Sequence, residues 1–148
     1  MSLPPYLISV GAFVCERTLI ERDFVVSAIR IIDLIYIPEL PVASRENTFP
    51  VVQASCCVIF KSIPGHNKQH RVELKLLDTT GELQDLGDPM EVNLESKIEG
   101  LPSGATIAAQ LNFGAKLLGT YYLCIYLDQE EVARTPFTLM RGPSGAKG

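Results

Sequence analysis

The sequence predicts an all-β protein that folds as an antiparallel β-sandwich of about seven to nine strands. Two observations lead to this fold class. Stretches in which apolar and polar residues alternate recur roughly every ten residues along the 148-residue chain, a spacing that is typical of sandwiches and barrels. Short clusters of Gly, Pro, Asn and Asp lie between these stretches and supply the backbone conformations that tight turns need.

The clearest strand signal is a β-hairpin over Gly119–Met140. An apolar row from Tyr121 to Leu127 alternates with a second, more polar row, which is the period-two pattern of a strand. Asp128–Glu130 then reverses the chain into another apolar run that ends at Met140. Because a two-stranded ribbon is only marginally stable alone, we expect a larger sheet to receive its apolar face.

The first half of the chain is expected to supply further strands. Tyr6–Cys15 is mostly apolar and predicts a first strand, whereas the charged Glu16–Asp23 indicates a turn or a single helical turn. Phe24–Ile37 is rich in β-branched residues and favours a strand, although apolar residues at helical spacing leave a helix open. The proline-rich Pro38–Pro50 is expected to be a surface loop, and Val51–Ile63 to be a long strand.

The second half repeats the same pattern. His70–Leu77 alternates cleanly and predicts a strand, and Asp78–Gly81 is expected to turn the chain into a polar connection. Met90–Leu94 and Ile107–Phe113 alternate as well, with a loop over Glu95–Gly104 between them. These segments complete the number of strands that a sandwich requires.

Composition and charge narrow the class of protein. The chain is 47% hydrophobic and 20% charged, which fits one globular domain; we expect residues 1–140 to form it and residues 141–148 to be a flexible tail. The net charge is −4 with scattered cations, so nucleic acid and membrane partners are not expected. No apolar run reaches the roughly twenty residues of a membrane span, and no signal-peptide pattern opens the chain. We therefore expect a cytoplasmic protein.

The four cysteines, Cys15, Cys56, Cys57 and Cys124, are expected to be buried free thiols, because no export signal accompanies them. A disulfide between Cys124 and one of the adjacent pair stays open, since that spacing resembles the inter-sheet bridge of immunoglobulin domains. Two observations count against it. The chain has no Trp to pack on such a bridge, and Cys124 belongs to the polar row of the closing hairpin.

Residue patterns for metal binding and catalysis are incomplete. His66 and His70 follow Cys56 and Cys57 in the order of a zinc site, but adjacent strand residues point to opposite faces. The acidic residues around Asp78 lack calcium-loop spacing and are better explained by a turn. A nucleophile elbow and a glycine-rich phosphate loop are both missing from the sequence. We expect no metal, no cofactor and no enzymatic activity.

Two regions resemble known families. Gly119–Asp128 followed by Thr135–Leu139 resembles the last two strands of immunoglobulin-like and fibronectin-like sandwiches. Phe13–Glu16, Asp23 and Ser27–Asp33 resemble an uncharacterised family of small bacterial β-sandwich proteins. The resemblance implies an immunoglobulin- or fibronectin-like sandwich from a bacterium. That family has no assigned activity, so the likeness implies no function.

We expect a non-catalytic protein-interaction or assembly module, whose partner is another copy or another bacterial or phage protein. The alternative is a small ligand-binding or hydrolytic sandwich with a site between the sheets or in the end loops. The expected interaction surface includes Tyr122 and Tyr126, because their outward row is too apolar to face only water and Tyr is favoured at interfaces. Val51–Phe60 carries no charge and is a second pairing surface if it lies at a sheet edge.

Overall fold

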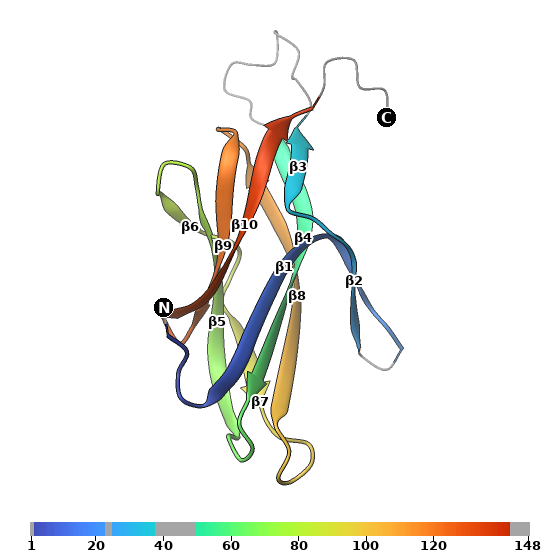
Figure 1. The fold of residues 1–148 in the computed structure, drawn as a ribbon, viewed down its shortest axis with the longest axis vertical. Coiled ribbons are helices and arrows are strands. Elements are labelled where there is room, and N and C mark those ends of the chain that lie inside the picture. The colour runs from blue at the N-terminus through green and yellow to red at the C-terminus, as the bar shows by residue number, and fades with distance from the viewer. Residues whose placement is uncertain (1, 23–24, 38–49, 143–148) are drawn as a thin grey trace.

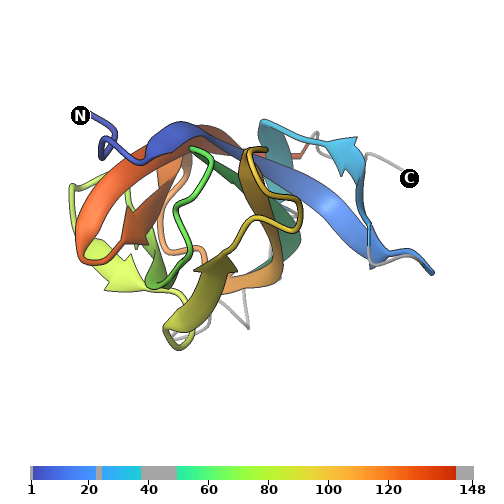
Figure 2. The same ribbon diagram turned by 90° about the horizontal axis from the view of Figure 1, so that it is seen from below.

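The computed structural model describes residues 2–22, 25–37 and 50–142. These ranges contain ten strands and no helix, arranged in two sheets that face each other (Figures 1 and 2). No helix long and apolar enough to cross a membrane therefore occurs in them. The all-β prediction is confirmed, whereas the expected count of seven to nine strands is not. The strands are β1 Leu7–Ile20, β2 Val26–Ile31, β3 Leu34–Ile37, β4 Val51–Ser62, β5 Lys68–Leu77, β6 Leu83–Asp85, β7 Met90–Leu94, β8 Ser103–Gly114, β9 Gly119–Leu127 and β10 Glu130–Arg141.

The two sheets differ in how their strands are connected. The first sheet has the order β2-β1-β4-β8, and all its neighbours are antiparallel. The second has the order β3-β10-β9-β5-β6, with β7 also paired to β5. Its one parallel pair joins β3 to β10, so the structure is mostly antiparallel, in agreement with a β-sandwich.

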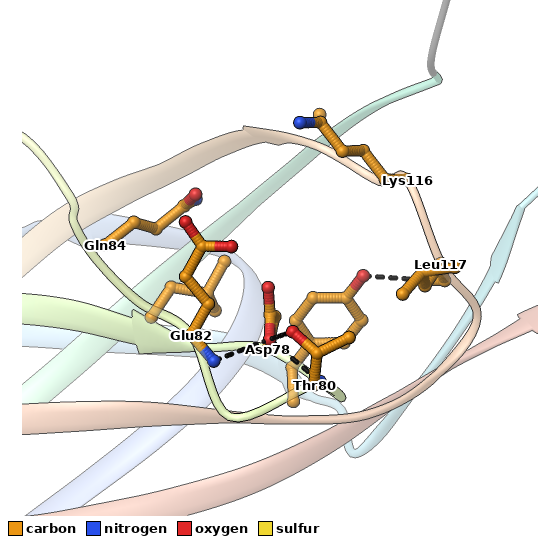
Figure 3. A pocket seen from close by; sticks show the side chains of 9 residues that line it. Asp78, Thr80, Glu82, Gln84, Lys116 and Leu117 are labelled. Carbon is orange, nitrogen blue, oxygen red and sulfur yellow. Dashed lines mark hydrogen bonds between the residues drawn. The ribbon is translucent and has the colours of Figure 1, made fainter.

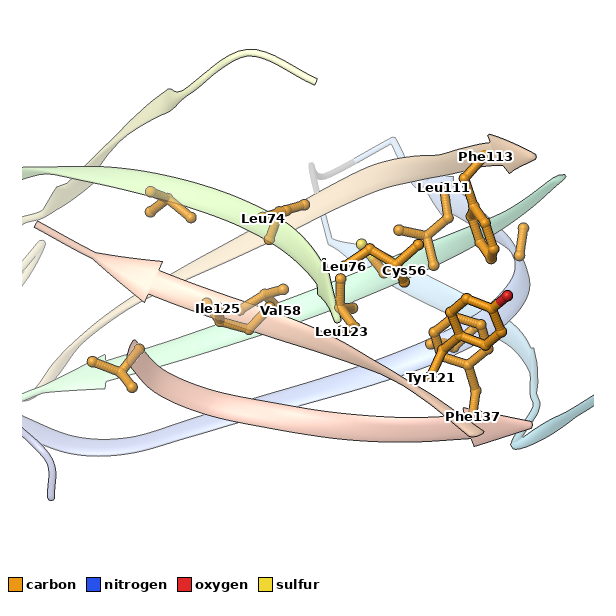
Figure 4. Close-up of a cluster of buried hydrophobic side chains, with 14 of the residues drawn as sticks. Cys56, Val58, Leu74, Leu76, Leu111, Phe113, Tyr121, Leu123, Ile125 and Phe137 are labelled. Carbon is orange, nitrogen blue, oxygen red and sulfur yellow. The ribbon is translucent and has the colours of Figure 1, made fainter. Parts of the chain in front are cut away.

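The core lies between the sheets and is built from alternate residues of each strand (Figure 4). In β9 the row that starts at Tyr121 is buried, as the alternation predicts, and Leu123 and Ile125 are fully buried. At one end of the core the rings of Phe113, Tyr121 and Phe137 meet with centres 5.6–6.0 Å apart, a spacing at which aromatic pairs attract.

Most of the charged segment Glu16–Asp23 is strand, so the prediction of a turn or helical turn was wrong for Glu16–Ile20. A turn follows only at Glu21 and Arg22, and Asp23 lies outside the described residues. β1 continues as a strand to Ile20, because β2 provides backbone partners for it through register pairs such as Arg17 with Ile29. The alternation that marks a half-buried strand is missing here because both faces of this part of the strand are exposed.

Phe24–Ile37 is strand rather than helix in its described part, but it forms two strands instead of one. β2 belongs to the first sheet and β3 to the second, and the chain crosses between them at Ile32 and Asp33. Arg30 has a φ of 57°, the left-handed region that bends a strand out of its ladder. Phe24, the expected loop at 38–49 and most of the expected tail, at 143–148, lie outside the described residues.

Candidate interaction surfaces

The predicted interaction residues Tyr122 and Tyr126 lie on the outer face of the second sheet, in the row of β9 that points away from the core. Both side chains are partly buried, and a cation lies over each ring. The Nζ atom of Lys75 is 5.0 Å from the centre of the Tyr126 ring, and the guanidinium carbon of Arg134 is 5.6 Å from that of Tyr122. Such contacts contribute about 0.5–1 kcal/mol at exposed sites.

Ion pairs surround the two tyrosines. Arg134 donates two hydrogen bonds to Glu131, at 2.5 and 2.9 Å, which lower the pKa of the glutamate and raise that of the arginine. The Nζ atom of Lys75 lies 3.9 Å from a carboxylate oxygen of Glu73 and 3.4 Å from one of Asp85. These charges already have partners within the chain, which is typical of a solvated sheet face. That this face binds a partner stays a prediction.

All four cysteines are buried and free. Cys56 faces the core from β4, whereas Cys124 lies on the opposite face of β9 from the core row. The inter-sheet disulfide is therefore excluded by the register of β9, as the alternation in the sequence predicted. Burial raises the pKa of Cys56 to about 12, so this thiol is a poor nucleophile near neutral pH.

The outer face of the first sheet carries few charged residues: Lys61, opposite Ser9, lies at one end of it, and Arg17, opposite Ile29, lies toward the other. It looks away from the second sheet, and its strand register places Phe13 directly opposite Cys57 and Cys15 opposite Ser55. Cys15, Ser55 and Cys57 are buried there because they are small and bulkier neighbours flank them. We call one set of residues on this face the uncharged face, although it includes the charged Arg17. The set consists of Gly11, Phe13, Cys15, Arg17, Leu19, Ile29, Ile31, Ser55, Cys57, Ile59, Thr106, Ala108 and Gln110.

A two-stranded ribbon extends this face beyond the sandwich. After Cys15 the strand β1 leaves β4 and pairs only with β2, and the resulting hairpin projects from one side of the molecule (Figures 1 and 2). We call residues 16–22 and 25–31 the ribbon. Four of its large apolar side chains are highly exposed: Leu19 at 47%, Ile20 at 67%, Val25 at 52% and Ile31 at 64%.

Four segments bring Tyr6, His66, His70 and Asp128 together at one end of the sandwich. His70 Nδ1 donates to an Asp128 carboxylate oxygen at 2.5 Å, and Arg71 N–H donates to the other oxygen at 2.9 Å. Because His70 Nδ1 carries the proton, His70 Nε2 accepts from His66 Nε2, 2.8 Å away. The ring of Tyr6 stacks over both imidazoles, with centres 4.2 and 4.8 Å apart. This hydrogen-bonded latch joins the start of β1 to two turns and β5.

The described ranges contain no group of three or more His, Cys, Asp or Glu side chains placed to hold a metal ion. The histidines of the latch bond to each other, and their Nε2 atoms are closer together than two ligands of a tetrahedral zinc ion, which lie roughly 3.3 Å apart. Cys56 and Cys57 point to opposite faces of β4, the geometry that strand alternation dictates.

A cleft of about 180 Å³ lies beside the turn after β5 (Figure 3). Several of its polar groups form hydrogen bonds within the chain. Asp78 Oδ1 accepts hydrogen bonds from the Thr80 N–H and hydroxyl and from the Glu82 N–H, and the first of these partners, Thr80, does most to lower the pKa of Asp78. The Tyr121 hydroxyl donates to the Leu117 carbonyl at 2.5 Å. The turn prediction is confirmed, and the cleft is smaller than the roughly 300–1,000 Å³ of small-molecule sites.

Comparison with known proteins assigns no function. No family model matches the chain, and no curated protein matches it. Among solved structures, a β-glucosidase from Listeria innocua in complex with isofagomine is 15% identical with a TM-score of 0.45, over 59% of this chain and 14% of the enzyme. The alkylpurine DNA glycosylase AlkC of Pseudomonas fluorescens, bound to DNA with an abasic site analog, is 11% identical with a TM-score of 0.42, over 74% and 28%. The chain thus spans a small part of each enzyme.

The interpretation of the sequence did not predict the ribbon or the latch. A signal for the ribbon was present, because Leu19 and Ile20 stand between two Glu-Arg pairs in a segment without Gly or Pro. No such signal existed for the latch, since Tyr6 and Asp128 are far apart in the chain and meet only in the folded protein.

Proposed function

We propose that this protein is a non-catalytic protein-interaction or assembly module whose binding element is the ribbon, together with the adjoining uncharged face. The observation that carries the proposal is the exposure of Leu19, Ile20 and Ile31 on a hairpin that projects from the sandwich. The described residues offer no layer that packs on it. Leu19 and Ile31 continue the uncharged face, whereas Ile20 lies on the opposite face of the ribbon. Exposed apolar patches rimmed by polar residues mark protein contact sites.

The energetics of the ribbon favour a bound state. A two-stranded ribbon is marginal in water when neither face is covered. Burying a Leu or Ile side chain completely contributes about 1.5–3 kcal/mol, so covering the exposed parts of these three contributes about 3–5 kcal/mol in total. A partner that covers the ribbon therefore both stabilises it and gains affinity from it.

The strand order supports an immunoglobulin-like version of the sandwich as the scaffold. Immunoglobulin domains place strands A, B and E side by side in one sheet and strands C, F and G in the other. With β1, β4, β5, β8, β9 and β10 taken as A, B, C, E, F and G, the neighbours in both sheets agree with this order. The short β7 departs from it, because it pairs with β5 rather than with β8.

A side-chain contact supports the same scaffold. In immunoglobulin domains a Tyr near the start of strand F bonds to backbone a few residues upstream, two residues before the second Cys. Tyr121 stands at the start of β9 and donates to Leu117, and the position two residues later is Leu123. Such sandwiches host many unrelated functions, so the scaffold supports binding only through the surface that it carries.

Site-specific photo-crosslinking in cells tests the proposal. A photoreactive side chain at Ile31, on the ribbon, is expected to give discrete protein adducts that are several-fold stronger than those from Leu83. Leu83 is a matched control, because it is also an exposed apolar strand residue, at 42%, but lies in β6 of the other sheet. Equal or absent adducts at the two positions would refute the proposed function.

A further inference from the structure

We propose that the ribbon pairs edge to edge with the ribbon of a second copy of this chain, antiparallel and centred on Leu19. The inference rests on the proposed function, because it names the partner of the same surface. Three features of the ribbon carry it: an open strand edge, the order of four charged residues, and the position of the apolar side chains.

The open edge belongs to the second half of β1. From Leu7 to Cys15 this strand pairs with β4, and from Cys15 to Ile20 it pairs with β2 on its other side. Beyond Cys15, no strand of the described ranges pairs with the edge that β4 has left. An unpaired edge of this kind presents a row of backbone donors and acceptors to another strand.

The charges along this edge are self-complementary. The order is Glu16 and Arg17 in β1, then Thr18-Leu19-Ile20, then Glu21 and Arg22 directly after the strand, with Arg22 in the turn, and the four charged side chains are exposed. When two copies meet about a two-fold axis through Leu19, Arg17 of each lies opposite Glu21 of the other, and Glu16 lies opposite Arg22. A two-fold axis repeats every contact, so four favourable cross-strand pairs form.

The same charges disfavour other registers. A shift of one residue in one direction places Glu16 opposite Glu21 of the second copy, and a shift in the other direction places Arg17 opposite Arg22. Like charges directly opposite each other destabilise an antiparallel pair. The charge order therefore selects the register centred on Leu19 over its immediate neighbours, as a specific interface requires.

The apolar side chains fit the same register. Leu19 meets its own symmetry mate at the axis, on the side of the sheet that continues the uncharged face. On the other side, Ile20 lies opposite Thr18 of the second copy and covers its methyl group. Residues directly opposite in an antiparallel pair have Cβ atoms about 4.5–5.5 Å apart, so these exposed side chains bury one another when the two copies pair.

Charge reversal in two separate variants provides the main test, read by sedimentation velocity up to about 1 mM because a small interface binds weakly. We expect the wild type to dimerise as its concentration rises. Arg17→Glu and Glu21→Arg each place like charges opposite each other at two positions, and each should weaken dimerisation about tenfold or more. An equimolar mixture of the two variants restores opposite charges at both positions and should dimerise about as well as the wild type.

A cross-link at the axis gives an independent readout. Leu19→Cys places two thiols opposite each other at a separation compatible with a disulfide, and mild oxidation is expected to give a covalent dimer. Ile31→Cys is the matched control, because Ile31 is also exposed, at 64%, but lies on β2 away from the axis. The four native thiols are buried and do not compete.

The outcomes separate this inference from the proposed function. A wild type that stays monomeric at about 1 mM, or a mixture that dimerises no better than its components, overturns the pairing of two copies. If Ile31 then still cross-links to a different protein in cells, the interaction module stands and only its partner is reassigned. If Ile31 gives no adduct above the Leu83 control, the proposed function fails as well.

Discussion

The contact between His66 and His70 makes the free energy of unfolding depend on pH, and the protein is expected to lose stability as the pH falls. Burial lowers the pKa of His66, and the neighbouring His70 and Lys68 lower it further. The folded pKa therefore lies below that of the unfolded chain, so the unfolded state binds more protons near pH 6. The stabilisation is fully present above the ordinary pKa of about 6.5 and is lost as the pH falls through the folded pKa.

The size of the effect follows from the charge that His66 gains. Its ring centre is 5.0 Å from that of His70, and two unit charges at that separation repel by about 0.8 kcal/mol in water and about 3 kcal/mol at an effective dielectric constant near 20. Because His66 is only half-buried, solvent screens its charge and an effect of about 1–2 kcal/mol is expected.

Urea unfolding at about pH 7.5 and pH 5 measures this difference, with pH values chosen to bracket the histidine pKa. We expect the wild type to lose about 1–2 kcal/mol more on acidification than His66→Phe, which keeps an aromatic ring against Tyr6 but cannot be protonated. His66→Ala should show the same reduced pH dependence as His66→Phe, at lower overall stability. Equal losses in the wild type and both variants would refute the coupling between the two rings.

Three further predictions concern the scaffold. Leu123→Ala should lower the free energy of unfolding by about 2–5 kcal/mol, measured in urea, because the side chain is fully buried; Tyr122→Ala, in the outward row, should cost clearly less. Asp78→Ala should lower the melting temperature because three hydrogen bonds lose their acceptor, whereas Glu82→Ala, whose backbone alone makes the bond, should leave it unchanged. Melting curves with and without reductant should agree within about 2 °C, because all four thiols are free.

Strands with one buried face could be predicted from the sequence, because burial of one face makes apolar and polar residues alternate along the strand. In β5, Val72, Leu74 and Leu76 are buried and alternate with polar neighbours, as expected. The same rule failed for Glu16–Ile20, since the ribbon buries neither face, and burial therefore imposes no alternating pattern on its residues. The change of sheet between β2 and β3 was also missed, because periodicity reports burial and not which sheet a strand joins.

The candidate surfaces were predicted only where they follow a single strand. The outward row with Tyr122 and Tyr126 follows from alternation alone, and its place on the outer face of the second sheet is confirmed. The cations that cover these rings come from neighbouring strands, β5 and β10, so the sequence did not reveal that the face is electrostatically satisfied. The latch depends on residues from four segments, a juxtaposition that only the folded chain creates.

We expect stability to respond to pH and self-association to respond to salt concentration, because the latch and the ribbon lie toward opposite ends of β1. Tyr6 precedes that strand and belongs to the latch, whereas Glu21 and Arg22 follow it and belong to the ribbon. Between them, the ladder of β1 with β4 keeps the strand in place. Weakening the latch at acid pH therefore leaves the ribbon attached.

The ribbon contains no histidine, the side chain that ordinarily changes charge near neutral pH, so the dimer constant should stay within about twofold between about pH 5.5 and pH 7.5. Raising the salt concentration from about 0.05 M to 0.5 M shortens the Debye length several-fold and should weaken dimerisation, because the pairs of Arg17 with Glu21 are exposed. Sedimentation velocity over this grid of pH and salt tests the separation. A dimer that dissociates at pH 5.5 together with the loss of stability would place the histidines, rather than the ribbon charges, in control of assembly.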